Sequence, residues 1–424
     1  MTDQLIIPAN INYDCTGCGK CCGGWAVPMT SSDFKRVATI DWQPYAKELN
    51  QPVNVLKDSL VSESENITDT NTITLNKNSL FRNLQDYEIK DSNYRYAIKV
   101  AHDRMCPFLV DNLCLIHSKY DSTTKPAICQ LFPYSFNETP TGTYVSVSFV
   151  SQAVIYNTGQ ALTNQYDYLL KKYADFKALF PNNAPNWTSL KLILGQSLEW
   201  SKYLEYENYI LKELDNQELG FGDRLNLIAK FLYSQTGKPI TDGSLKLKYL
   251  DKHLLVNLFK IYFPQGAVVR GEADFNVNRF VYQLTWGNIF PGVVFKVNNH
   301  SFKLDDLAKI QFDENDADMS NLLYRYYYCK IFGKLYFGAG FGQLSLVAGF
   351  NHLAFLYALI KINSKILAKI RGVGKVSFID LAQSIKTIEK RLGETFVSPN
   401  TAASLELLLS SPGRLKRVLA TNNI

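Results

Sequence analysis

The stretch Cys15-Thr16-Gly17-Cys18-Gly19-Lys20-Cys21-Cys22 places four cysteines in one short run near the start of the chain. Two successive C-x-x-C steps bring three sulfurs towards one point, as the opening of many ferredoxin motifs does. The intervening glycines allow the backbone to wrap around a small object. We therefore expect this loop to bind a metal, and the first part of the chain to fold around that metal.

A second group of cysteines lies between residues 106 and 129. It reads Cys106-Pro, then Cys114-Leu-Ile-His117, then Cys129-Gln-Leu-Phe-Pro133, and the eighth cysteine, Cys329, stands far away. The N-terminus has no basic stretch followed by an apolar one, so we expect no secretion signal. In such a chain, clustered thiols indicate metal binding more often than disulfides. The predicted metal ligands are Cys15, Cys18, Cys21, Cys22, Cys106, Cys114 and Cys129.

The residues leave the identity of the metal open between zinc and iron. Zinc prefers four cysteines, or three cysteines and a histidine, and His117 lies three residues after Cys114. An iron–sulfur cluster, in the first place a 4Fe-4S cubane, is favoured by the ferredoxin-like opening and by the Cys106-Pro107 step. Positive charge eases formation of the ligating thiolates, and four basic residues lie near the cysteines in sequence: Lys20, Arg104, Lys119 and Lys125.

The composition is that of an ordinary globular protein, with 46% hydrophobic and 20% charged residues in 424. A net charge of +6 is mild and no dense Lys/Arg stripe accompanies it, so we expect no nucleic acid partner. The most apolar stretch, residues 344–362, contains Asn351 and His352, which are costly in lipid. We interpret that stretch as a buried helix, expect no membrane partner, and expect a cytoplasmic protein.

Periodicity divides the chain into two regions. Residues 31–50 are predicted to hold a short helix that starts after Ser31 and Ser32, strands are predicted at residues 94–100 and 143–150, and the polar residues 61–93 indicate an insertion with little core. We predict an α+β fold, in which a small irregular metal-held domain with short strands (residues 1–160) precedes a larger, mainly helical domain (residues 161–424). The candidate helices are 162–177, 187–215, 222–235, 244–262, 318–335, 343–369, 377–392 and 402–420.

Two further stretches have a functional and a plainer interpretation. Residues 334–343 contain Gly338, Gly340 and Gly342, and such a turn lets backbone N–H groups approach a phosphate or carboxylate. Because no acidic residue follows at a suitable distance, we interpret this turn as a joint between helices rather than a cofactor loop. Residues 324–329 read Tyr-Arg-Tyr-Tyr-Tyr-Cys, which is typical of core or interface packing, with peptide binding as the alternative.

The cysteine motifs, together with Trp25 after Cys22 and with Pro107 and Pro133 beside the second group, resemble the YkgJ-type family of zinc- or iron-chelating cysteine-cluster proteins. The Cys-Cys-x-Gly-Trp form, Asp33 downstream and the chain length are most similar to the flagellin lysine N-methylase branch of that family. This resemblance implies an iron–sulfur protein that transfers a methyl group from S-adenosylmethionine to lysines of a protein substrate. It also implies that the seven cysteines ligate the cluster, with Trp25 and Asp33 around it.

One position departs from the methylase pattern. That branch has a further Cys-Pro on a strand-like stretch shortly after the Phe-Pro motif, where this chain has Ser151-Gln152. A serine oxygen is a poor substitute for a thiolate on a soft iron site. Two alternatives to an enzyme therefore stand beside the methyltransferase: a non-catalytic binding module stabilised by zinc or an iron–sulfur cluster, and a redox sensor. The sequence assigns no catalytic residue and no S-adenosylmethionine-binding residue.

Overall fold

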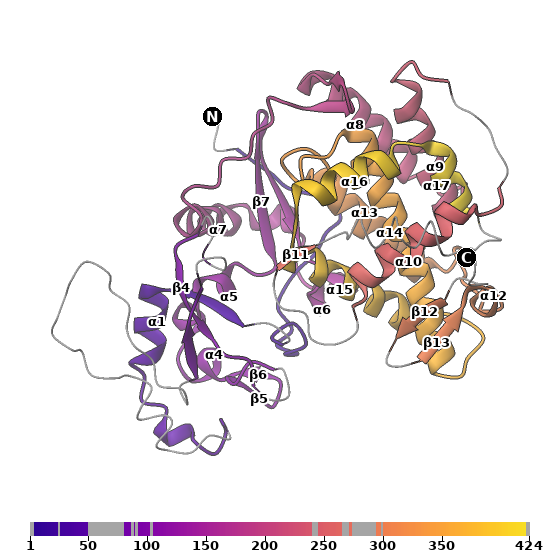
Figure 1. Cartoon of the computed structure of the whole chain (residues 1–424). Coiled ribbons are helices and arrows are strands. Elements are labelled where there is room, and N and C mark those ends of the chain that lie inside the picture. Colours follow the sequence, from indigo (N-terminus) through magenta and orange to yellow (C-terminus); the bar gives the residue numbers. More distant parts are fainter. Residues whose placement is uncertain are drawn as a thin grey trace. The chain divides into compact units, whose positions relative to one another are not determined.

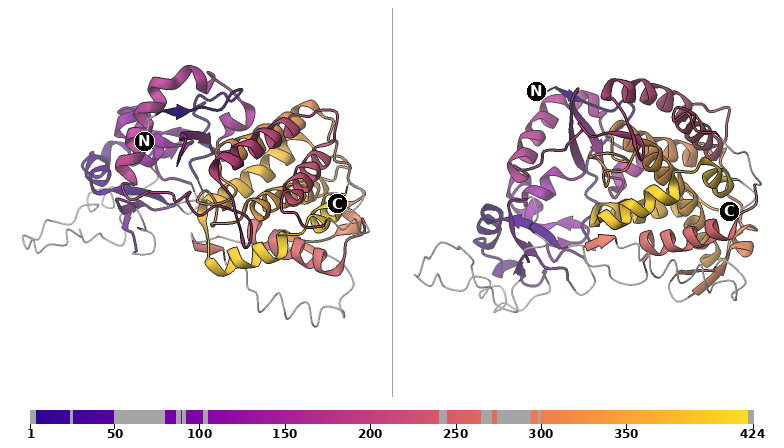
Figure 2. Two further views of the ribbon diagram at one scale, coloured as in Figure 1. Left: turned by 90° about the horizontal axis from the view of Figure 1, so that it is seen from above. Right: turned by 45° about the horizontal axis from the view of Figure 1, so that its top comes forward.

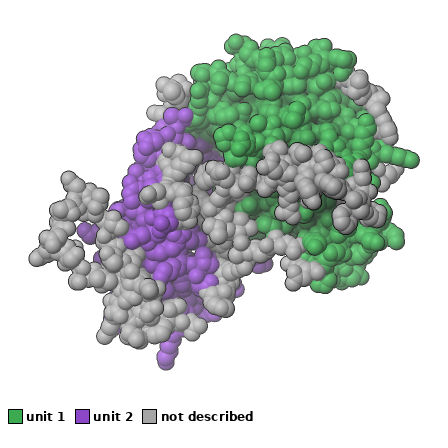
Figure 3. Space-filling model, in the orientation of Figure 1, with its two compact units in different colours: residues 1–8, 137–150, 185–424 green, residues 9–136, 151–184 purple. Residues whose placement is uncertain are grey.

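The computed structural model describes residues 4–23, 26–49, 80–85, 89, 92–101, 105–239, 245–264, 271–273, 294–297 and 300–420. The chain packs into two compact units, coloured separately in Figure 3. We call residues 9–136 and 151–184 the cysteine unit, and residues 1–8, 137–150 and 185–424 the helical unit. Each unit is built from more than one stretch of chain, and the sequence boundary at residue 160 stays a prediction.

A three-stranded antiparallel sheet organises the cysteine unit. Strand β4 (Tyr94–Ile98) lies in the middle, between β2 (Val27–Thr30) and β3 (Phe81–Asn83). Helix α1 (Ser31–Ala38) follows β2 directly; it begins where the sequence predicts but ends at Ala38, well before residue 50. Its start is fixed by a capping box, in which the Thr30 hydroxyl accepts from the Asp33 N–H and the Asp33 carboxylate accepts from the Thr30 N–H.

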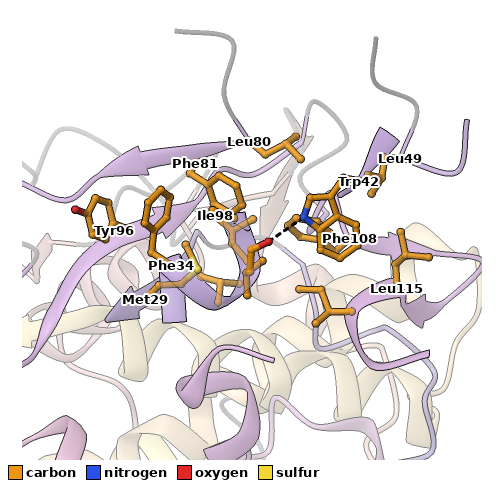
Figure 4. Packing of buried hydrophobic residues seen from close by; sticks show 14 residues of the cluster. Met29, Phe34, Trp42, Leu49, Leu80, Phe81, Tyr96, Ile98, Phe108 and Leu115 are labelled. Carbon is orange, nitrogen blue, oxygen red and sulfur yellow. Dashed lines mark hydrogen bonds between the residues drawn. The ribbon is translucent and has the colours of Figure 1, made fainter. Parts of the chain in front are cut away.

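One hydrophobic core holds this sheet and helix together, and Figure 4 shows its packing. The Phe34 ring from α1 stacks on Tyr96 of β4 with centroids 4.2 Å apart. The Trp42 ring lies 4.8 Å from that of Phe108, and its indole N–H donates to the Val37 carbonyl oxygen (2.9 Å). Phe81 of β3 is fully buried in this core. The prediction that residues 61–93 add little core is therefore wrong for β3, whereas residues 61–79 lie outside the described residues.

Short elements complete the cysteine unit. Most of them are single turns of helix or two-residue strands, and α7 (Tyr166–Leu179), with 14 residues, is the exception. In chain order they are η1 (Gln43–Tyr45), β5 (Leu109–Val110), β6 (Leu113–Cys114), α4 (Leu115–Lys119), η2 (Ser122–Thr124), α5 (Ala127–Leu131), α6 (Gln152–Tyr156), η3 (Leu162–Gln165) and α7 (Tyr166–Leu179).

The helical unit gathers its helices into one bundle, coloured from magenta through orange to yellow in Figures 1 and 2. A small sheet has the order β1-β8-β7, in which β1 runs parallel to β8. Strands β1 and β8 belong to the helical unit, whereas β7 begins in the cysteine unit and enters the helical unit at Asn137. The sheet strands are β1 (Leu5–Ile6), β7 (Tyr134–Thr139) and β8 (Gly142–Val147), and the longer helices are α8 (Trp200–Leu214), α9 (Phe221–Ser234), α10 (Tyr249–Tyr262), α13 (Ala317–Phe332), α14 (Leu346–Ile370), α15 (Phe378–Glu394), α16 (Pro399–Leu409) and α17 (Pro412–Leu419). The smaller elements are β9 (Lys191–Ile193), β10 (Gln196–Ser197), β11 (Gly271–Ala273), β12 (Val294–Val297), β13 (His300–Lys303), α12 (Leu304–Leu307) and β14 (Thr395–Val397).

Helix α14 confirms the interpretation of the apolar stretch as a buried helix. Its two central polar side chains are buried and hydrogen-bonded: Asn351 donates to the Leu409 carbonyl oxygen (2.5 Å), and the His352 Nε2 lies 2.6 Å from the Tyr262 hydroxyl. Buried polar groups of this kind are stable only with such partners. Across the described part of the chain, no helix combines the length and apolarity needed to cross a membrane.

The α+β prediction is confirmed, and two of the expected helices differ. Residues 187–199 hold the hairpin β9–β10 instead of the start of a long helix, and α8 begins only at Trp200. The expected helix 402–420 is two helices, because Pro412 has no N–H to continue the first and begins α17 instead.

Candidate metal centre

The first four cysteines lie in a loop without helix or strand. Gly17 and Gly19 both have φ +65°, a backbone conformation that residues with a Cβ rarely adopt. The loop closes on itself through the Cys22 N–H, which donates to the Gly19 carbonyl oxygen (2.9 Å). The glycine spacing noted in the sequence thus produces a tightly turned loop with sulfurs along it.

The hairpin β5–β6 lies directly against this loop. A Cβ on Gly19 would be 2.9 Å from Leu109 Cδ1 and 3.0 Å from the Asn112 carbonyl oxygen, whereas a Cβ on Gly17 would be 3.4 Å from Leu113 Cδ2. The hairpin turns at Asp111 and Asn112, both with positive φ, as a two-residue β-hairpin turn requires. The close approach at Gly19 leaves no room for a side chain there.

The two cysteine groups meet through the backbone. The Cys106 N–H donates to the Cys22 carbonyl oxygen (3.1 Å), and Gly23 forms an antiparallel bridge with Met105. The Cys106 carbonyl oxygen in turn accepts from the Leu109 N–H (2.9 Å), which turns the chain into the hairpin. Cys22 and Cys106 are therefore held side by side, although they are far apart in sequence.

Cys114 and Cys129 complete the second group. Cys114 pairs with Leu109 across the hairpin and occupies the N-cap position of α4 without a side-chain capping hydrogen bond, and Cys129 lies in α5. Both, with Cys106, pack against the hydrophobic core of the cysteine unit. The three thiols are close enough to influence one another electrostatically, since Cys106 and Cys114 both raise the pKa of Cys129.

Burial keeps the Cys106 and Cys129 side chains in the neutral thiol form. It raises the pKa of the Cys106 thiol to about 12, with Cys114 adding to the rise, and it is also the main cause of the raised pKa of Cys129. Lys125 lowers the pKa of Cys129 as expected from the sequence, but burial outweighs that effect. Arg104 lies outside the described residues. A bound cation deprotonates its thiol ligands, so it would supply the positive charge that these sites otherwise lack.

The first group is anchored by the segment that precedes it. The N–H groups of Tyr13 and Asp14 donate to the carbonyl oxygens of Gln160 and Thr158, each across 3.0 Å, and the Asp14 carboxylate accepts from the Gln160 N–H (2.9 Å). The Tyr13 side chain reaches the thiols: it is hydrogen-bonded to Cys15 and lies near Cys21, and its burial together with Cys15 raises the pKa of Tyr13. The cysteine loop therefore starts from a segment whose backbone is held by these hydrogen bonds.

The seven predicted ligands fit a metal centre by their chemistry. All seven are cysteines that form no disulfide and whose residues retain some exposure, unlike the buried Cys329, although the thiol groups of Cys106 and Cys129 are themselves buried. Among the residues that the structure describes, no three His, Cys, Asp or Glu side chains already converge as a metal site. The choice of ligands among the seven stays a prediction. His117 is exposed on α4; His102 and Trp25 lie outside the described residues.

The two other stretches noted in the sequence have structural roles. The helix N-terminus that follows the glycine-rich turn is occupied, since the Glu406 carboxylate accepts from the backbone N–H and the hydroxyl of Ser345. This arrangement favours the joint between helices over a cofactor loop. In the aromatic run, Tyr326 and Tyr327 are fully buried, as is Cys329, whose pKa burial raises to about 12. These side chains belong to the core.

A family comparison covers this part of the chain. Residues 14–150 match the CxxCxxCC family, described as a "Putative zinc- or iron-chelating domain". The matched domain starts one residue before Cys15 and includes all seven clustered cysteines, so it supports metal binding and the general family resemblance. No curated protein and no solved structure matches the chain.

Two residues outside the cysteine motifs support the matched domain: Asp33, which the resemblance already implied to lie around the cluster, and Tyr13, which sequence reasoning missed. Asp33 has a signal in the sequence, because Thr30-x-x-Asp33 ahead of apolar residues predicts a helix cap, but its contacts beyond that cap do not follow from it. Tyr13 carries no such signal. Its position beside Cys15 depends on residues 158–160, which are distant in sequence.

Proposed function

We propose that the cysteine unit binds an iron–sulfur cluster of the 4Fe-4S type through thiolates drawn from its seven clustered cysteines. The observation that carries this proposal is the meeting of the two cysteine groups at the Cys106–Cys22 hydrogen bond. This hydrogen bond brings together two groups of candidate ligands that are all thiols and that number more than one four-ligand site needs. Thiolates are soft ligands, which suit iron–sulfur clusters. A bound cluster would supply electron transfer or a structural cross-link, and the chain's own residues hold and shield its ligands.

Protein purified without oxygen tests this proposal. A brown protein with about four iron and four sulfide per chain supports the cluster, and Cys15→Ser should lower the iron content. Cys329→Ser is the matched control, because this buried thiol lies in the helical unit and should leave the iron content unchanged. A colourless protein with neither iron nor sulfide would rule the cluster out.

Zinc is the competing occupant of the same thiols. A colourless protein with one zinc per chain, which unfolds on chelation, supports a non-catalytic module in which the metal staples the cysteine unit and the helical unit binds a partner. A redox sensor is the third candidate. It is supported if cluster loss in air changes binding to a partner protein, because seven thiols exceed the four that one site uses.

The resemblance to the flagellin lysine N-methylase branch extends the proposal to methyl transfer. On this proposal S-adenosylmethionine is a cofactor, the partner is a protein with accessible lysines, and the protein acts in the cytoplasm. Ser151 weakens the methyltransferase proposal, because the methylase branch has a cysteine at this position. This buried serine precedes α6, and its carbonyl oxygen accepts from the Ile155 N–H (3.1 Å). The occupied helix start at Ser345 leaves the glycine-rich turn without support as the cofactor site.

Two measurements separate methyl transfer from metal binding alone. Calorimetry with S-adenosylmethionine, followed by transfer of a labelled methyl group to lysine-rich proteins, should give binding and labelling if the protein is a methyltransferase. Ser151→Cys tests the departure from the branch, and an increase in iron content or in labelling would show that the missing thiol matters. A metal-loaded protein that binds no S-adenosylmethionine would leave the non-catalytic module.

A further inference from the structure

Asp33 has more hydrogen-bond partners than a helix cap requires. Its side chain is only 2% exposed. One carboxylate oxygen accepts from the Thr30 N–H (3.1 Å), which completes the cap of α1. The other oxygen accepts from the Ala127 N–H (3.2 Å) and from the Arg36 guanidinium (2.5 Å). Ala127 is the first residue of α5, so a single carboxylate joins the start of α1 to the start of α5.

Arg36 reinforces the same connection from the next turn of α1. Its Nε donates to the Thr124 carbonyl oxygen (3.3 Å), and its NH2 group donates to the Lys125 carbonyl oxygen (3.1 Å). The chain just before α5 is therefore held by a guanidinium, and the first residue of α5 by the carboxylate that pairs with that guanidinium. We call Asp33 and Arg36 the α1–α5 latch.

The latch acts on the helix that carries Cys129. Helix α5 has only five residues, and so short a helix is not stable without tertiary contacts. Cys129 lies two residues after Ala127, in the same turn, and its N–H donates to the Pro126 carbonyl oxygen (2.9 Å). The direction of the Cys129 side chain therefore depends on where the latch holds the start of α5.

We propose that Asp33 and Arg36 are positioning residues of the metal centre, which fix α5 so that the Cys129 thiol points to the site shared with Cys106 and Cys114. This inference rests on the proposed metal binding. Neither latch residue is a ligand, because the Asp33 oxygens are already used by three N–H donors. The role corresponds to the outer-shell contacts that orient ligands in metal proteins.

Asp33→Asn and Arg36→Gln test the latch. The asparagine replaces one acceptor oxygen with a donating amide, so at least one of the three N–H groups loses its partner. Metal affinity, measured by competition with a chelator, should fall about 10- to 100-fold, as for other outer-shell contacts. In metal-free protein, the rate of Cys129 alkylation, resolved by mass spectrometry, should rise relative to that of Cys114.

Thr30→Ala is the matched control. It removes the hydroxyl that caps α1 but leaves the Asp33 contacts with Ala127 and Arg36 in place. It should lower stability as a lost cap does, without changing metal affinity or Cys129 alkylation. If Asp33→Asn fails to fold, Arg36→Gln carries the test, because it keeps the Asp33 bonds to Thr30 and Ala127.

Two results are kept distinct by this design. If the native chain binds no metal, the proposed function fails, while the alkylation rates still report on the latch. If folded Asp33→Asn and Arg36→Gln match the Thr30→Ala control in metal affinity and in Cys129 alkylation, the latch is only structural and the inference is overturned.

Discussion

The backbone N–H of Cys106 donates to the carbonyl oxygen of Cys22 across 3.1 Å, and this bond joins two cysteine groups that the sequence separates widely. The bond uses only main-chain atoms, so both thiol side chains remain available for a metal. The hairpin β5–β6, which begins three residues after Cys106, covers the first group at Gly19. The geometry of the candidate centre thus depends on the packing of backbone against backbone.

Gly19→Ala should disturb this packing more than Gly17→Ala does. Both positions have φ +65°, so both variants carry the strain of a left-handed backbone, roughly 1–2 kcal/mol. Only at Gly19 does the new methyl group approach Leu109 and the Asn112 carbonyl oxygen within 3.0 Å, which adds about 1–3 kcal/mol of overpacking. Urea unfolding and metal content measure the difference. Equal losses in the two variants would contradict the close contact.

Tyr13→Phe should weaken the metal centre without changing the fold. The substitution removes only the hydroxyl that is hydrogen-bonded to Cys15, and outer-shell contacts of this kind are worth about tenfold in metal affinity. Chelator competition measures the affinity, and the reduction potential provides a second measurement if iron is bound. Tyr134→Phe is the control, because its ring packs 5.5 Å from that of Tyr13 and no hydrogen bond joins it to Cys15. Equal affinities for the two variants would remove Tyr13 from the site.

His352 should make the helical unit less stable in mild acid. Burial lowers the pKa of His352 from 6.5 to about 3, so the folded protein binds fewer protons than the unfolded chain between these values. Its stabilising contribution is complete above pH 6.5 and is lost as the pH falls towards 3, by about 2 kcal/mol at pH 5.

The difference between variants isolates this effect from other titrating groups. His352→Phe should flatten the dependence of unfolding free energy on pH between 7 and 5, relative to the native chain. Tyr262→Phe, which removes the hydroxyl 2.6 Å from the histidine ring, should lower stability and keep the slope. If the unfolding free energy of His352→Phe depends on pH as steeply as that of the native chain, another group titrates instead.

Glu406→Ala should destabilise the start of α14. The Glu406 carboxylate accepts from the N–H and the hydroxyl of Ser345, and its loss leaves polar groups at a largely buried helix start, at a cost of about 1–3 kcal/mol. Ser404→Ala on the same helix is the control, since its exposed hydroxyl donates only to the Asn400 carbonyl oxygen (2.8 Å). Urea unfolding distinguishes them. A Glu406 variant as stable as the control would reopen the glycine-rich turn as an anion site.

The sequence by itself determined the chemistry of the centre and the class of fold. Clustered thiols in C-x-x-C steps indicate a metal-binding domain, which the family match supports, while the choice of ligands among them stays a prediction. The helix expected at Ser31 and Ser32 begins at Ser31 as α1. The burial of the apolar helix α14 could also be predicted, because Asn351 and His352 within it are costly in lipid. Local patterns of this kind depend on neighbours in the chain, which a sequence displays directly.

Only the tertiary structure decided which distant residues meet. Phe81 enters the core from a stretch whose polar composition indicated none, and residues 187–199 form a hairpin where helix was expected. The Cys106–Cys22 bond and the contact of Asp33 with Ala127 join segments that carry no mutual signal in one sequence. Long-range packing and backbone hydrogen bonds select these pairings, because burying unpaired polar groups is costly wherever the chain folds back on itself.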